Sequence, residues 1–138
     1  MPLLPQFSLR AALWIDAFAS GATGILGLVL AEPLSDWTNL PVALLRGAGL
    51  ALIPFVVYLV ALATRDVVSR SGVRLVIGIN IAWVIASAGL LLSGAVDPNA
   101  FGYVFVIAQG AAVALFAELQ ATALGREGRQ GQGMPASA

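Results

Sequence analysis

Four polar side chains inside otherwise apolar stretches are the residues of this chain best suited to chemistry. They are two carboxylates, one amide and one phenol: Asp16, Glu118, Asn80 and Tyr58. Each lies about six or seven residues from one end of its apolar stretch, which is roughly 9–10 Å of helix. Ionisable groups at such depth in a membrane are costly and usually functional. The pattern predicts one polar layer that binds a small cation, a proton or an amphipathic ligand.

The same residues also fit a purely structural interpretation. Asn80 would tie helices together, and Asp16 and Glu118 would reach water near the membrane surface. In that case the protein is an accessory subunit that packs against a larger membrane complex. Under the first interpretation, two carboxylates in one layer repel each other, so a cation or a ligand amine between them would stabilise the site.

Arg46 is a second candidate, on the other side of the predicted bundle. It lies about six residues inside its apolar stretch, on the side away from most other arginines. One interpretation is a contact to an anion or a lipid headgroup at the outer mouth. The other is an arginine that extends along the helix toward Glu32 or Asp36, because long basic side chains reach for the membrane surface.

Composition excludes several kinds of site. The chain contains no cysteine and no histidine, and its two methionines are Met1 and Met134. Thiol chemistry, imidazole catalysis, zinc sites and the usual haem ligands are therefore absent. We expect no metal, no cofactor and no enzymatic activity. The net charge is zero and the positive residues are scattered arginines, so we expect no nucleic-acid partner.

The elements that must position these residues are four apolar runs. Of the 138 residues, 59% are hydrophobic and 10% are charged, and the mean hydropathy is +0.93; soluble domains have about 25% charged residues. A membrane span needs roughly 20 apolar residues. The sequence predicts an all-α, polytopic four-helix bundle formed by residues 1–124 and a flexible polar tail, 125–138. The spans are about 11–31, 40–64, 73–94 and 101–124, with residues 32–39 as a loop.

The distribution of charge predicts the orientation. The arginines outside the spans fall in the leader, the central loop and the tail, whereas the other two connections carry only acids. Arginine is enriched in cytoplasmic loops, so both termini are expected in the cytoplasm.

Small residues predict which helix faces pack, because close helix contacts in lipid depend on them. At 100° per residue, Ala43, Gly47 and Pro54 share a face of the second span, and Ala114, Glu118 and Ala121 share one of the fourth. Gln109 points away from that last face, which suits a helix–helix or subunit contact and favours a homo-oligomer.

The two halves of the chain also follow a similar order of motifs. Ala-Ser, an acid followed by proline, and a small-residue run occur in each half, beginning at Ala19 and at Ala86. This is either a parallel internal repeat or chance in a chain rich in alanine, glycine and leucine.

The first two spans, with Leu-Leu-Arg-Gly-Ala-Gly-Leu at residues 44–50, resemble the DoxX-like group of small bacterial membrane proteins. The resemblance covers about half of the chain. It implies a four-helix bundle in the bacterial inner membrane, sometimes linked to quinone or oxidoreductase partners. This chain has no cofactor ligand of its own.

Overall fold

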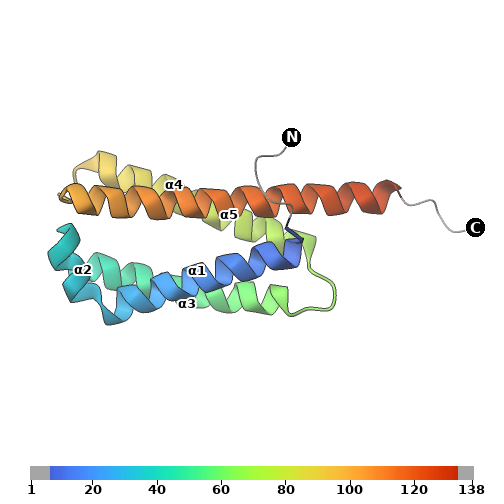
Figure 1. Ribbon diagram of the computed structural model, residues 1–138, viewed down its shortest axis with the longest axis horizontal. Helices are drawn as coiled ribbons and strands as arrows, with labels where there is room; N and C mark the ends of the chain where they lie inside the picture. Colours follow the sequence, from blue (N-terminus) through green and yellow to red (C-terminus); the bar gives the residue numbers. More distant parts are fainter. Residues whose placement is uncertain (1–6, 134–138) are drawn as a thin grey trace, which may run out of the picture.

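The protein is all-helical in the part that its structure, a computed structural model, describes, which is residues 7–133. Five helices follow one another: α1 (Leu9–Val29), α2 (Ala31–Thr38), α3 (Val42–Ala63), α4 (Arg70–Ser93) and α5 (Ala100–Gly133). Figure 1 shows the four long helices lying lengthwise in one bundle, with α2 at one end. Helices α1, α3, α4 and α5 are each long and apolar enough to cross a membrane. The predicted fold class is confirmed.

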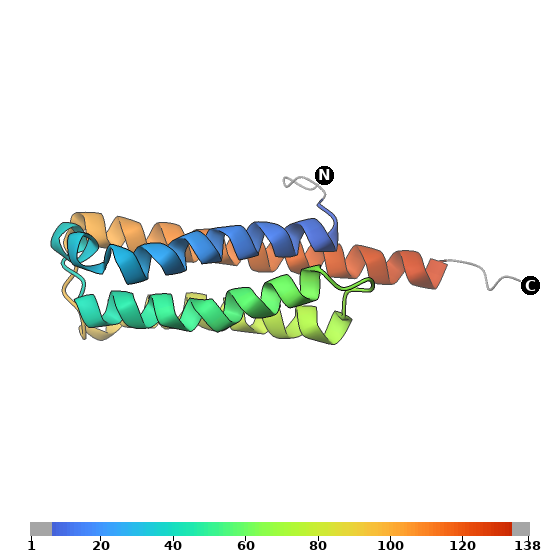
Figure 2. The ribbon, with the colours of Figure 1, turned by 90° about the horizontal axis from the view of Figure 1, so that it is seen from below.

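Two segments differ from their predicted structure. Residues 32–39, expected as a loop, belong mostly to α2. Pro33 is the third residue of that helix, where its missing N–H has no intrahelical partner to lose. The predicted flexible tail begins instead as helix, because α5 continues through Gly125 to Gly133. In Figures 1 and 2 this last part of α5 extends past the other helices. Residues 134–138 of the predicted tail lie outside the described residues.

Polar residues at the helix starts fix where three of the long helices begin. The Ser8 hydroxyl accepts a hydrogen bond from Ala11 N, and the Ser69 hydroxyl accepts one from Gly72 N, both at 3.1 Å. Asn99 Oδ1 does the same for Gly102 N at 2.8 Å. Each cap satisfies a backbone donor that the first turn of a helix leaves unpaired.

The long helices are arranged as two antiparallel pairs. Helix α1 packs along α3, and α4 packs along α5. The pairs meet mainly where α1 contacts α5, whereas α3 and α4 touch little although they follow each other in the chain. In Figure 2 α1 lies in front of α5, and α3 lies in front of α4. Of the four sides of the bundle, three are closed by close contact and the α3–α4 side is not.

Glycines bring α1 and α3 together. A Cβ added to Gly27 would lie 2.8 Å from the Leu45 carbonyl oxygen, and one added to Gly49 would lie 2.8 Å from that of Gly24. The contact therefore joins backbone to backbone. The predicted face of the second span was wrong: Ala43, Gly47 and Pro54 are exposed, and α3 buries the face with Leu45, Gly49, Leu52 and Leu59 instead.

Side chains tie the helices together at each end of the bundle. At the end with most arginines, Arg10 donates to the Ala63 carbonyl, Arg126 to the Phe7 carbonyl and Arg70 to the Leu124 carbonyl. At the other end, Asn99 Nδ2 donates to the Trp37 carbonyl and Asn39 Nδ2 to the Asp97 carbonyl. The start of α1, the α3–α4 loop and the C-terminal part of α5 thus lie at one end.

Candidate functional site

A buried carboxylate lies at the centre of the bundle. The Asp16 side chain is 0% exposed and accepts three hydrogen bonds. Ser20 Oγ donates to its Oδ1 at 2.9 Å, and Asn80 Nδ2 and Gln120 Nε2 donate to its Oδ2 at 2.8 and 2.7 Å. These bonds join α1, α4 and α5. Hydrogen bonds to a charged acceptor are stronger than those between neutral groups, so the layer holds three helices in register.

The orientation of the two amides follows from their partners. Asn80 Nδ2 also donates to Gln120 Oε1 at 3.1 Å. A flipped Asn80 would place its oxygen against a carboxylate oxygen and against Gln120 Oε1, neither of which donates when Asp16 is ionised. The amide nitrogen of Asn80 therefore points into the layer, and its oxygen points out of it.

The structure brings together only two of the four side chains that were predicted to meet. Asp16 and Asn80 bond directly. Tyr58 is half-buried on α3 near the first turn of α4, where its hydroxyl lies 3.1 Å from the position of a Cβ on Gly72. Gly72 is eight residues before Asn80, which is about 12 Å along the helix. Glu118 is exposed on α5.

Gln120 takes the position in the layer that the sequence interpretation gave to Glu118. The two residues are separated by 200° around the helix, so they face nearly opposite sides. The face that α5 buries contains Val106, Gly110, Ala117, Gln120 and Leu124. These positions are three, four or seven residues apart, so they share one face of the helix. Because the lipid-facing side of α5 is apolar as well, this spacing does not single out Gln120 from the sequence.

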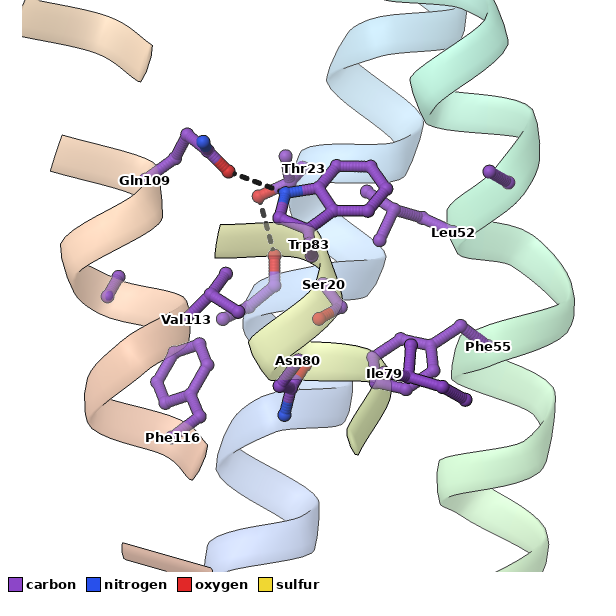
Figure 3. Close-up of a pocket in the computed structure, with 13 residues that line it drawn as sticks. Ser20, Thr23, Leu52, Phe55, Ile79, Asn80, Trp83, Gln109, Val113 and Phe116 are labelled. Atoms are coloured by element: carbon purple, nitrogen blue, oxygen red, sulfur yellow. Dashed lines mark hydrogen bonds between the residues drawn. The ribbon is translucent and has the colours of Figure 1, made fainter. Parts of the chain in front are cut away.

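An apolar cavity of about 310 Å³ lies directly against the polar layer. Ser20 and Asn80 form its polar wall, and most other lining residues are apolar. Figure 3 shows Phe55 and Ile79 on one side of these two residues and Val113 and Phe116 on the other. All four long helices contribute to the lining. The volume falls within the usual range of small-molecule sites, roughly 300–1,000 Å³.

A second cavity, about 560 Å³, continues from the first toward α2. The two share the lining residues Thr23, Leu52, Trp83 and Gln109, so they adjoin. At this junction Trp83 Nε1 donates to Gln109 Oε1 at 2.9 Å, and Gln109 Nε2 donates to Ser87 Oγ at 3.1 Å. Figure 3 shows the hydrogen bond that joins the Trp83 indole to the Gln109 amide. Of the two contacts proposed for Gln109, the structure contains the helix–helix one.

The first cavity reaches residues on the loosely closed side of the bundle. Ala51 of α3 and Ile79 of α4 line the first cavity and are also exposed. Helices α3 and α4, which touch little, therefore both contribute exposed residues to the lining of the first cavity.

Arg46 lines neither cavity. Its guanidinium donates to Glu32 Oε1 at 3.2 Å, and the two side chains are 50% and 75% exposed. Exposed ion pairs of this kind contribute little to stability, about 0–1 kcal/mol. The geometry matches the interpretation in which Arg46 extends toward Glu32. No cluster of potential metal ligands occurs in residues 7–133.

Comparison with protein-family models, curated proteins and solved structures gave no match to this chain.

Proposed function

We propose that this is a small, non-enzymatic integral membrane protein that binds an amphipathic molecule inside its helix bundle. The observation that carries the proposal is the cavity of about 310 Å³ with apolar walls and one polar wall, made by Ser20 and Asn80. Ligand sites in proteins combine these features: mostly apolar lining and a few polar groups that fix orientation. The molecule enters from the bilayer between α3 and α4, and its chain occupies the apolar space.

A cavity-filling substitution tests the proposal. Ala112 lines the first cavity, and its neighbour Ala111 lines neither cavity and faces outward. The wild type, Ala112→Phe and Ala111→Phe would be purified in lipid nanodiscs, and their bound small molecules measured by native mass spectrometry. We expect a retained amphiphile in the wild type and in Ala111→Phe, and its loss in Ala112→Phe. Equal retention in all three proteins would refute the proposal.

The accessory-subunit function is supported by a different feature, the exposed Glu118. A carboxylate on the outer surface of a membrane-spanning helix needs water or a polar partner. Ala114 and Ala121, one turn to either side, are small enough for another helix to approach closely. If a partner subunit covers this face, Glu118→Leu will abolish its co-purification in mild detergent, whereas the Ala112→Phe protein will retain it.

We also propose that the bundle lies in a bacterial inner membrane with both termini in the cytoplasm. The support is the charge distribution: Arg65, Arg70, Arg74 and Arg126 belong to the end of the bundle where α1 begins. The opposite end carries Glu32, Asp36 and Asp97. Positive residues favour the cytoplasmic side.

A further inference from the structure

The polar wall of the first cavity contains a hydrogen-bond acceptor without a partner. No described residue donates a hydrogen bond to Asn80 Oδ1, although Asn80 as a whole is only 2% exposed. In the described part of the chain, every side-chain oxygen or nitrogen that is fully buried has a hydrogen-bond partner. An atom without a partner, such as Asn80 Oδ1, is therefore not fully buried. Asn80 Oδ1 is therefore open, and since Asn80 lines the first cavity, the opening is into that cavity.

Ser20 adds a second acceptor to the same wall. Its hydroxyl hydrogen is used in the bond to Asp16 Oδ1, so only oxygen lone pairs remain for a ligand. The other polar groups near the cavity are already paired: Thr23 donates to the Ala19 carbonyl, and Trp83 donates to Gln109. In Figure 3 Ser20 lies below Thr23 and Trp83, and Asn80 lies just below Ser20. A ligand at this wall meets acceptors, so its polar group must donate.

The charge behind the wall favours a cation. Asp16 is fully buried, and its three hydrogen-bond donors are all neutral side chains. The one ion pair among residues 7–133 joins Arg46 and Glu32, far from Asp16. A buried carboxylate without a countercharge is unfavourable, and a cation close to it offsets the cost. Ser20 and Asn80 separate Asp16 from the cavity by a single layer of side chains.

We infer that the molecule bound in this cavity is an amphipathic amine, whose ammonium group donates to Asn80 Oδ1 and Ser20 Oγ and is attracted by Asp16. The inference rests on the proposed function and specifies the chemical class of its ligand. The alkyl part of the amine lies between the aromatic and aliphatic walls and extends past Trp83 into the second cavity.

A panel of probes with one chain and different polar groups tests this inference. The probes are dodecylamine, dodecanol, dodecyltrimethylammonium and dodecanoate, titrated into protein in nanodiscs of zwitterionic phosphatidylcholine. Trp83 lines both cavities, and Trp14→Phe with Trp37→Phe leaves it as the reporter of fluorescence. Titration of the Ala112→Phe protein measures partition into the bilayer alone and is subtracted.

We expect dodecylamine to bind at least tenfold more tightly than dodecanol, because both donate but only the amine is charged. Dodecylamine should also bind more tightly than dodecyltrimethylammonium, which is charged but has no N–H donor. Dodecanoate should not bind. Asp16→Asn should reduce the advantage of the amine over the alcohol to less than threefold. The comparison among probes in the wild type tests the inference even if Asp16→Asn does not fold.

The outcomes separate the inference from the proposed function. Equal binding of amine and alcohol in the wild type, or tighter binding of dodecanoate, overturns the inference while the cavity remains a binding site. No difference between the wild type and Ala112→Phe for any probe overturns the proposed function as well.

Discussion

Asp16 is the residue on which the interior of this bundle depends. Its carboxylate is stable in an apolar interior because three side chains from three helices donate hydrogen bonds to it. Transfer of an unpaired carboxylate into such an environment is unfavourable by many kcal/mol. Replacement of any one donor therefore destabilises the whole polar layer and not only the hydrogen bond that is lost.

The contrast between Gln120 and Glu118 provides the first prediction. Gln120→Leu removes one donor to Asp16 and the acceptor for Asn80, so we expect a loss of about 1–3 kcal/mol in the free energy of unfolding. Glu118→Leu replaces an exposed carboxylate by an apolar side chain and should leave stability unchanged or raise it. Unfolding in mixed detergent micelles, monitored by circular dichroism, measures both. Equal effects of the two substitutions would contradict the register of α5.

At the scale of single residues, the sequence shows which polar residues lie within the spans. It does not always show whether their side chains point into the bundle or toward lipid. The proximity of Asp16 and Asn80 follows from their depth and their place on polar stripes. Gln120 was missed because Glu118 was chosen as the α5 member of the layer, from the stripe with Ala114 and Ala121 on the far side of the helix. In a membrane helix the lipid-facing and core-facing sides are both apolar, so hydrophobic periodicity does not show which side is buried.

The elements are held together by close backbone contact as much as by side chains. The positions of Gly27 in α1 and Gly49 in α3 leave no room for a Cβ, and one added to Gly24 would lie only 3.3 Å from the Leu52 side chain. The short distance between the helices lets many atoms make van der Waals contact, which is the main attraction between helices in lipid.

A pair of glycines on α3 gives the second prediction. The Cβ of Gly49→Ala would lie 2.8 Å from the Gly24 carbonyl oxygen, and backbone does not move aside easily. We expect a loss of about 1–3 kcal/mol in stability, as for other overpacked interiors. At Gly47 a Cβ meets nothing within 4 Å, so Gly47→Ala should be neutral or stabilise by up to about 1 kcal/mol through helix propensity. Thermal unfolding of the two variants in the same detergent distinguishes them.

The junction of α2 with α5 gives the third prediction. Asn99 caps α5 through Gly102 N and donates to the Trp37 carbonyl of α2. Asn99→Ala loses both bonds, and the cap alone is worth about 0.5–2 kcal/mol. No described residue bonds to the side chain of Asp97, so Asp97→Ala should change stability by less than about 0.5 kcal/mol. Hydrogen exchange measured by mass spectrometry should show faster exchange in α2 for Asn99→Ala alone.

The four long helices were predictable because the length and the apolar composition of a segment are enough to identify a membrane span. The four predicted spans begin and end within a few residues of α1, α3 and α4 and of the start of α5. The helical end of α5 was not predicted, because glycine and glutamine after Gly125 are typical of mobile segments. Tertiary contacts stabilise this part: Arg126 donates to the Phe7 carbonyl, and Glu127 accepts from Leu9 N.

At the scale of the whole molecule, the arrangement in two pairs explains why a cavity exists. Tight contact within each pair and along α1–α5 leaves the α3–α4 side open. An exact internal repeat would make the α1–α5 and α3–α4 contacts equivalent, and they differ in this structure. The repeat stays a prediction. The same asymmetry supports the proposed entry of the ligand between α3 and α4.

The orientation of the whole molecule gives the last prediction. The chain has no cysteine, so single cysteines report their side of the membrane without a background. Asp36 and Asp66 are exposed acids at opposite ends of the bundle, one in α2 and one in the α3–α4 loop. In intact bacterial spheroplasts, a membrane-impermeant maleimide should label Asp36→Cys and leave Asp66→Cys unlabelled. Permeabilised cells should label both, which controls for reactivity. Labelling of Asp66→Cys alone in intact spheroplasts would reverse the orientation, because the arginine-rich end would then lie outside, against the usual distribution of positive charge.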